Sequence, residues 1–148
     1  MRLARRLFYT GDSSLSKVRN QSVKTILVFD KYPNMLEAFN RFLSQENYRV
    51  LTAERLEEAL MIIEVMGVDL MIMDTGKNSE VSVLESLRVI RKKNLSLPII
   101  LTATHSDTLA ETVAKELGFA DLVLKPFDPE DIKRVVKRLV HKDQLSFS

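Results

Sequence analysis

From residue 23 onward, short apolar runs alternate with segments whose apolar residues recur at helical spacing. The apolar runs cover residues 23–29, 49–53, 70–73, 98–102 and 122–124. The helical patterns follow them in turn, over residues 35–43, 56–63, 84–90, 109–117 and 132–140. Apolar residues three and four positions apart line one face of a helix, so each pattern predicts a helix with one buried side. The chain therefore predicts five strands and five helices in alternation.

Runs this short and continuously apolar are typical of strands in a sheet that is covered on both faces. Alternation of strand and helix predicts right-handed parallel crossovers and a doubly wound α/β sheet. In such a sheet, ligands bind beyond the carboxyl ends of the strands. Four side chains that carry chemistry stand at or near such ends: Asp30, Asp74, Thr102 and Lys125. No glycine-rich phosphate loop follows the first strand, which argues against a dinucleotide site.

The composition is that of one globular domain, with 148 residues of which 45% are hydrophobic and 28% are charged. The chain has no cysteine, which excludes disulfides, thiolate metal sites and cysteine nucleophiles. Two histidines are too few for a histidine metal cluster. No apolar run approaches the length of a membrane span, and we expect a cytoplasmic protein.

The net charge of +2 is unevenly distributed along the chain. Residues 1–22 carry five Lys or Arg and one acid, and we interpret them as a basic, solvated extension. The domain itself is expected over residues 23–141, with a short tail at 142–148. The pair Arg5 and Arg6 is not followed by the apolar segment of an export signal. If the extension binds a ligand, anionic lipid or nucleic acid fits its charge best.

Four segments together resemble the receiver domain of bacterial response regulators, over residues 25–141. They are residues 26–34 with Asp30 at the strand end, residues 68–74 ending at Asp74, residues 97–103 with Thr102, and residues 118–127 with Lys125 followed by Pro-Phe. The last segment is the most specific of the four. The resemblance implies a flavodoxin-like receiver fold, whose parallel sheet has the strand order 2-1-3-4-5.

The resemblance also implies the chemistry of the site. Asp74 would accept a phosphoryl group from a histidine kinase or phosphotransfer protein, and Lys125 would neutralise a phosphate oxygen. The Leu-Thr-Ala match makes Thr102 the switch hydroxyl, whereas counting from Pro98 or back from Lys125 puts Ala103 there. A receiver is a signalling module, so we expect no enzymatic activity beyond self-phosphorylation and self-dephosphorylation at Asp74.

A magnesium ion is implied at the same site, with Asp30, Asp74 and Gly76 as its ligands. However, Lys31 stands at the second acid of the family's acidic pair, which is the direct metal ligand. A lysine removes one ligand charge and adds a cation that repels a dication. We therefore predict that magnesium binds weakly or not at all, and that Lys31 contacts Asp74 or Asp30.

Three further positions depart from the family's pattern. Asn78 replaces the proline that usually follows the phosphoacceptor by four residues, and residues 81–83 replace the usual Asp-Gly turn. Leu122 stands where an aromatic switch residue often lies. By contrast, the Lys125–Pro126 bond is expected to be cis, as the resemblance implies.

Three functions from different classes fit the sequence. The leading one is a stand-alone receiver that signals through contacts with a downstream protein. The second is a degenerate receiver that acts as a phosphorylation-independent binding or dimerisation module. The third is a nucleic-acid or membrane adaptor that works through the basic extension, although no helix-turn-helix pattern predicts a DNA-binding domain. We also expect that a partner or a second copy docks on the basic face of the last helix, formed by Lys133, Arg134, Lys137 and Arg138.

Overall fold

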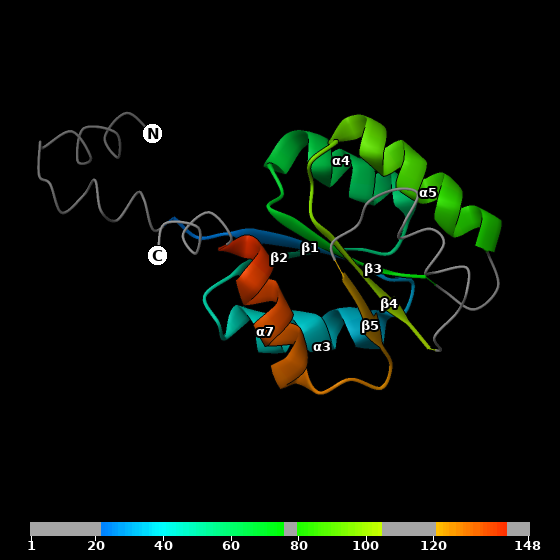
Figure 1. The fold of residues 1–148 in the computed structure, drawn as a ribbon. Coiled ribbons are helices and arrows are strands. Elements are labelled where there is room, and N and C mark those ends of the chain that lie inside the picture. The colour runs from blue at the N-terminus through cyan, green and yellow to red at the C-terminus, as the bar shows by residue number, and fades with distance from the viewer. Residues whose placement is uncertain (1–21, 76–79, 105–120, 142–148) are drawn as a thin grey trace, which may run out of the picture.

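The computed structural model describes residues 22–75, 80–104 and 121–141 (Figure 1). Five strands lie in this part: β1 (Thr25–Phe29), β2 (Arg49–Ala53), β3 (Leu70–Asp74), β4 (Ile99–Ala103) and β5 (Asp121–Leu124). Four helices accompany them: α3 (Pro33–Ser44), α4 (Leu56–Met66), α5 (Glu80–Lys93) and α7 (Pro129–Val140). The helix predicted over residues 109–117 lies outside the described residues.

The strands form one parallel sheet in the order β2-β1-β3-β4-β5. This confirms both the doubly wound α/β class and the predicted strand order. The order reverses direction between β1 and β3, because the chain first moves to β2 and then returns past β1. The carboxyl ends of β1 and β3 are therefore neighbours at the switch point, where this class of sheet binds its ligands.

Helices cover both faces of the sheet, with α4 and α5 on one side and α3 and α7 on the other (Figure 1). Alternate residues of β3 pack into the two core clusters, one on each face of the sheet. Met71 and Met73 pack in the cluster that includes α4 and α5, whereas Leu70 and Ile72 pack in the cluster that includes α3 and α7. All four side chains are at most 2% exposed. The apolar run is therefore continuous because both faces of the strand are buried, as the sequence predicted.

Local signals set the ends of the helices. Asp128 caps α7, because its carboxylate accepts a hydrogen bond of 2.9 Å from the backbone N–H of Glu130, and Pro129 occupies the first helical position. Gly67 ends α4 with a φ of 69°, in the left-handed region that glycine tolerates. Among the described helices, none is both long enough and apolar enough to cross a bilayer.

The segment after β5 is anchored on α3 by aromatic packing. The ring of Phe127 lies 5.4 Å from the ring of Phe39, which is fully buried and also packs against Phe42. The bond between Lys125 and Pro126 is cis, as expected. The Lys-Pro-Phe segment thus attaches the chain beyond β5 to the helical layer, next to the carboxyl ends of the central strands.

Candidate functional site

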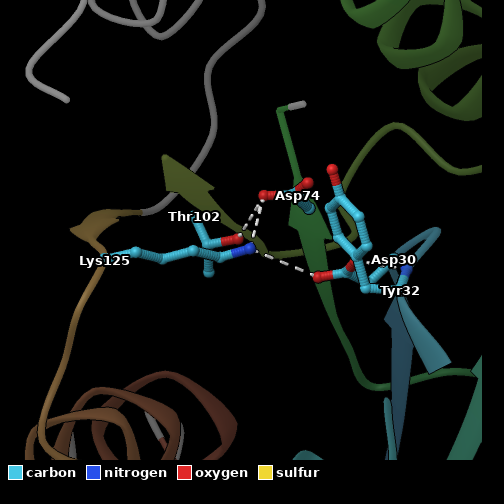
Figure 2. Close-up of polar contacts among 5 residues, drawn as sticks. All are labelled: Asp30, Tyr32, Asp74, Thr102 and Lys125. Atoms are coloured by element: carbon cyan, nitrogen blue, oxygen red, sulfur yellow. Dashed lines mark hydrogen bonds and ion pairs between the residues drawn. The ribbon is translucent and has the colours of Figure 1, made fainter. Parts of the chain in front are cut away.

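The four side chains predicted at strand ends converge at the carboxyl edge of the sheet (Figure 2). Asp30 directly follows β1, and Asp74 ends the neighbouring strand β3. Thr102 lies on β4 in register with Asp74. Lys125 directly follows β5, and its backbone N–H donates to the carbonyl of Ala103. Strand pairing alone therefore brings together groups that are far apart in the sequence.

Lys125 is the centre of the site's electrostatics. Its Nζ lies 2.8 Å from Oδ1 of Asp74 and 3.5 Å from Oδ2 of Asp30. The two carboxylate side chains are 7% and 2% exposed, and the Lys125 side chain is 16% exposed. Because water screens buried charges poorly, this shared ammonium offsets much of the repulsion between the two acids. The described cluster of two carboxylates and one ammonium carries a formal charge of −1.

Thr102 is also close to the acceptor carboxylate. Its Oγ1 donates a hydrogen bond of 3.3 Å to Oδ1 of Asp74, the same oxygen that contacts Lys125. Thr102 is 1% exposed. The alternative position for the switch hydroxyl, Ala103, has no hydroxyl to offer and lies one residue beyond the register partner of Asp74. The geometry therefore favours Thr102 over Ala103 as the hydroxyl of this site.

Asp30 is the most deeply buried of the site's acids, at 3% exposure for the whole residue. Burial raises the pKa of its carboxyl above the ordinary value of an aspartate, and the negative charge of Asp74 acts in the same direction. The backbone N–H of Tyr32 donates a 2.9 Å hydrogen bond to its Oδ1 and, together with Lys125, opposes the rise in pKa. Asp30 is thus a desolvated carboxylate held in place from two sides.

Lys31 does not do what the sequence predicted. Its ammonium lies 5.4 Å from the centre of the Tyr32 ring, and among the described residues it makes no ion pair with Asp74 or Asp30. The prediction of such a contact is wrong in this structure, and Lys125 contacts both acids instead. The physical reason is the local chain path. The backbone at Tyr32 turns back to bond Asp30, which leaves residue 31 exposed on the outside of the turn.

The donors available to a divalent metal are few. No group of three or more His, Cys, Asp or Glu side chains suited to a metal occurs in the described part of the chain. Magnesium prefers six oxygen ligands, which here would start from only two carboxylates that already share an ammonium. Gly76, the third predicted ligand, lies outside the described residues. The described donor set therefore does not fit a tight magnesium site.

The predicted basic face of α7 is largely neutralised by acids of the same chain. Lys133 pairs with Glu130 at 3.2 Å, and Arg138 pairs with Asp121 at 2.6 Å. Arg134 pairs with Asp131, also on α7. These partly exposed pairs are individually weak, but three acids beside four bases reduce the formal charge of this surface from +4 to +1. Association through α7 remains a prediction.

Comparison with known proteins agrees with this geometry. The sequence model of the response regulator receiver domain matches residues 26–137. The regulatory protein PhoP of Bacillus subtilis is 27% identical over 123 residues, which are 83% of this chain and 51% of PhoP. The response regulator GtcR of Aneurinibacillus migulanus is 30% identical over 78% of this chain and 48% of its own length. The chain thus spans about half the length of these curated relatives.

Solved structures give the same answer. A CheY-like receiver domain from Methanospirillum hungatei matches with a TM-score of 0.75 at 22% identity, over 84% of this chain and 99% of that one. The response regulator TrrA of Thermotoga maritima, solved in complex with Mg²⁺ and BeF, matches with a TM-score of 0.68 at 34% identity, over 79% and 99%. A family match over more than half of the chain, on this fold and with these residues gathered at the switch point, shows that the chain belongs to the response regulator receiver domain family of two-component signalling.

Proposed function

We propose that Asp74 accepts a phosphoryl group and that this event changes the affinity of the protein for a partner. The observation that carries the proposal is the pairing of Oδ1 of Asp74 with Lys125 at 2.8 Å and with Thr102 at 3.3 Å. The other oxygen, Oδ2, accepts no hydrogen bond from any described residue. One carboxylate oxygen is thus fixed by two donors, which leaves Oδ2 as the nucleophile.

The transfer follows from this arrangement. Oδ2 of Asp74 attacks the phosphorus atom in line, an oxygen–phosphorus bond forms, and the bond from phosphorus to the donor's imidazole nitrogen breaks. The electron pair of that bond stays on the imidazole, and the product is an acyl phosphate. Negative charge spreads over the equatorial oxygens in the transition state, and stabilising this charge supplies most of the catalysis. Lys125 is the cation in place to do so, and Thr102 is the hydroxyl donor.

Receiver domains generally bind magnesium at their phosphorylation site, and the TrrA structure contains it. In this chain the described donors fall short of such a site, because Lys31 replaces an acid and Lys125 already neutralises the remaining pair. We therefore propose that phosphoryl acceptance at Asp74 is slow and depends only weakly on magnesium.

The donor is proposed to be a histidine kinase or a phosphotransfer protein, because receiver domains interact with these proteins. Receiver domains are signalling modules rather than classical enzymes. The output of this chain is proposed to be contact with another protein rather than chemistry on a small substrate. The same proposal includes the stand-alone role that we expect from the sequence.

A second function is favoured by one specific observation. Only two carboxylates gather in the described site, and an ammonium of the same chain already contacts both. Such a pocket is already arranged by its own charges, as it would be in a degenerate receiver that binds partners without phosphorylation. The two functions differ in whether Asp74 ever carries a phosphoryl group.

Labelling with radioactive acetyl phosphate and phosphoramidate, each with and without magnesium, distinguishes them. The expected result is incorporation into the native protein, loss of incorporation in Asp74→Asn, and little effect of magnesium. Asp131→Asn is the matched control, because this exposed carboxylate on α7 lies outside the site. If the native protein takes no label from either donor, with or without magnesium, Asp74 is not a phosphoacceptor. The second function, a phosphorylation-independent binding module, is then the one supported.

A further inference from the structure

Two helix faces on one side of the molecule stand out by their exposed side chains. Helices α4 and α5 lie next to each other over the same face of the sheet (Figure 1). Their inner sides are fully accounted for, since Ala59 and Ile63 of α4 share a core cluster with Leu87 and Ile90 of α5. Of the eight large hydrophobic residues that are exposed in the described part, five lie on these two helices or directly after α5. The outer faces therefore carry apolar side chains that are exposed in the described part of the domain.

The outer face of α4 is acidic and apolar. Met61 and Val65 are 65% and 71% exposed, one helical turn apart. Glu57 and Glu64 flank them on the same side, because residues three, four and seven apart share one face of a helix. Helix α4 contains acids in its first turn and no basic residue in its last. The result is a stripe of two aliphatic side chains bordered by negative charge.

The outer face of α5 has the opposite charge. Val89 is 37% exposed, and Arg88, Lys92 and Lys93 are exposed around it at spacings that place them on one side. One exposed acid, Glu85, lies on the same side a turn earlier, so this face carries three positive charges and one negative charge. Lys93 makes an ion pair of 3.4 Å with Glu64 of α4. This contact also shows that the last turns of the two helices lie at the same height. An acidic stripe and a basic stripe thus run side by side, with aliphatic residues on both.

We propose that a second copy of this chain docks on this surface, with α4 of each copy over α5 of the other. A two-fold interface requires a patch that is complementary to itself, and neighbouring stripes of opposite charge meet that requirement. A two-fold axis that runs along the helices places each acidic stripe over the partner's basic stripe. Since the last turns are level, Glu64 then faces Lys92 of the partner subunit. Glu57 is level with Glu85 of the partner subunit and lies within about a turn of Arg88 of the partner subunit, so the attraction is strongest at the last turns.

The size of the surface sets the strength of the association. Helix α4 has 11 residues, so it is about 16 Å long. Two helices that lie about 10 Å apart offer less than the roughly 800 Å² per partner that a stable interface buries. We therefore expect a weak, micromolar dimer whose charged rim makes it sensitive to salt. The proposal does not involve Asp74 and is independent of phosphoryl transfer.

Sedimentation velocity on the full chain gives the first test. At protein concentrations up to about 0.5 mM, the native protein should dimerise in about 0.05 M NaCl and dissociate in about 0.5 M NaCl. A native protein that stays monomeric at the highest concentration in low salt overturns the proposal.

A charge exchange gives the sharper test. One variant carries Glu57→Lys and Glu64→Lys, and the other carries Arg88→Glu and Lys92→Glu. Each variant alone has like charges on both stripes and should be monomeric, whereas a one-to-one mixture restores both opposite pairs and should dimerise as the native protein does. Circular dichroism of each variant confirms that the substitutions leave the fold intact.

The matched control reverses two charges on the other side of the sheet, with Lys133→Glu and Lys137→Glu on α7. If two copies associate through α4 and α5 rather than through the basic face of α7, this variant should dimerise as the native protein does. If it is monomeric while both α4 and α5 variants still dimerise, α7 is the interface and the proposal is wrong. Failure of the mixture to dimerise also overturns it, because the pairing of α4 with α5 of the partner subunit is its central statement.

Discussion

Replacing Lys31 by aspartate should raise the affinity of the site for magnesium. The substitution restores the acid that the family places here and removes a cation from the rim of the site. A unit charge about 8 Å from a dication contributes roughly 1 kcal/mol even through water. Exchange of an ammonium for a carboxylate changes the charge by two units, or roughly 2 kcal/mol, which corresponds to about a 30-fold gain in affinity. Direct ligation by the new carboxylate would add to this value.

The affinity is measured directly, without any phosphoryl donor, by titrating magnesium into isotope-labelled protein and following its amide resonances. Two variants serve as comparisons. Lys31→Gln removes the cation without adding a ligand, so it should gain about half as much free energy. Lys24→Asp makes the same change in charge at the opposite end of β1 and should gain almost nothing.

Three results would refute this reasoning. A native protein that already binds magnesium as tightly as Lys31→Asp would show that Lys31 does not weaken the site. Equal gains in Lys31→Asp and Lys24→Asp would show that only the overall charge matters. A Lys31→Asp protein that still binds no magnesium would assign the obstacle to the segment after β3, where Gly76 and Asn78 stand.

Three other substitutions test the electrostatics of the site. Lys125→Gln leaves two buried carboxylates without their shared cation and should lower the free energy of unfolding by about 3 kcal/mol in urea titrations. Adding Asp74→Asn should recover part of that loss, and an undiminished loss in the double variant would refute the coupling between Lys125 and Asp74. Thr102→Val removes one hydroxyl donor worth about 1 kcal/mol and should slow labelling about fivefold, whereas Thr52→Val on β2 should leave the rate unchanged. The pKa of Asp30 is raised mainly by burial, so the folded protein binds a proton more readily than the unfolded one between the two pKa values. Ionised Asp30 therefore costs stability, and Asp30→Asn should be more stable than the native protein at about pH 7, with an advantage that shrinks as the pH falls toward about 4 in urea titrations; an advantage that grows on acidification would reverse the assigned sign.

The fold was predictable because its signals are local and repeated. Each strand is a short apolar run buried on both faces, and the helices are amphipathic, so the period of the pattern gives the element. Neighbouring strand ends also placed Asp30, Asp74, Thr102 and Lys125 together, since strand order determines which ends meet. The strand register favoured Thr102 over Ala103 as the switch hydroxyl, a choice that counting along the sequence had left open. Thr102 pairs with Asp74 across the β3–β4 ladder, and Ala103 lies one position further.

Side-chain direction at the edge of the site was not predictable in the same way. The sequence gives Lys31 a charge and a position next to Asp30, and those two facts suggested an ion pair. The turn that carries the Tyr32 amide to Asp30 directs residue 31 outward instead. The basic run of α7 is a similar case. Its partners include Asp121 on β5, which no spacing along the helix reveals.

The central claim is that Asp74 carries the phosphoryl group. After treatment with phosphoramidate, reduction with borohydride converts an aspartyl phosphate to homoserine, and peptide mass spectrometry then identifies the residue. We predict homoserine at position 74 in the native protein, and an unmodified protein when the same treatment is applied to Asp74→Asn. Homoserine at any other aspartate, or none at all under conditions that modify a receiver with a complete acidic pair, would contradict the claim.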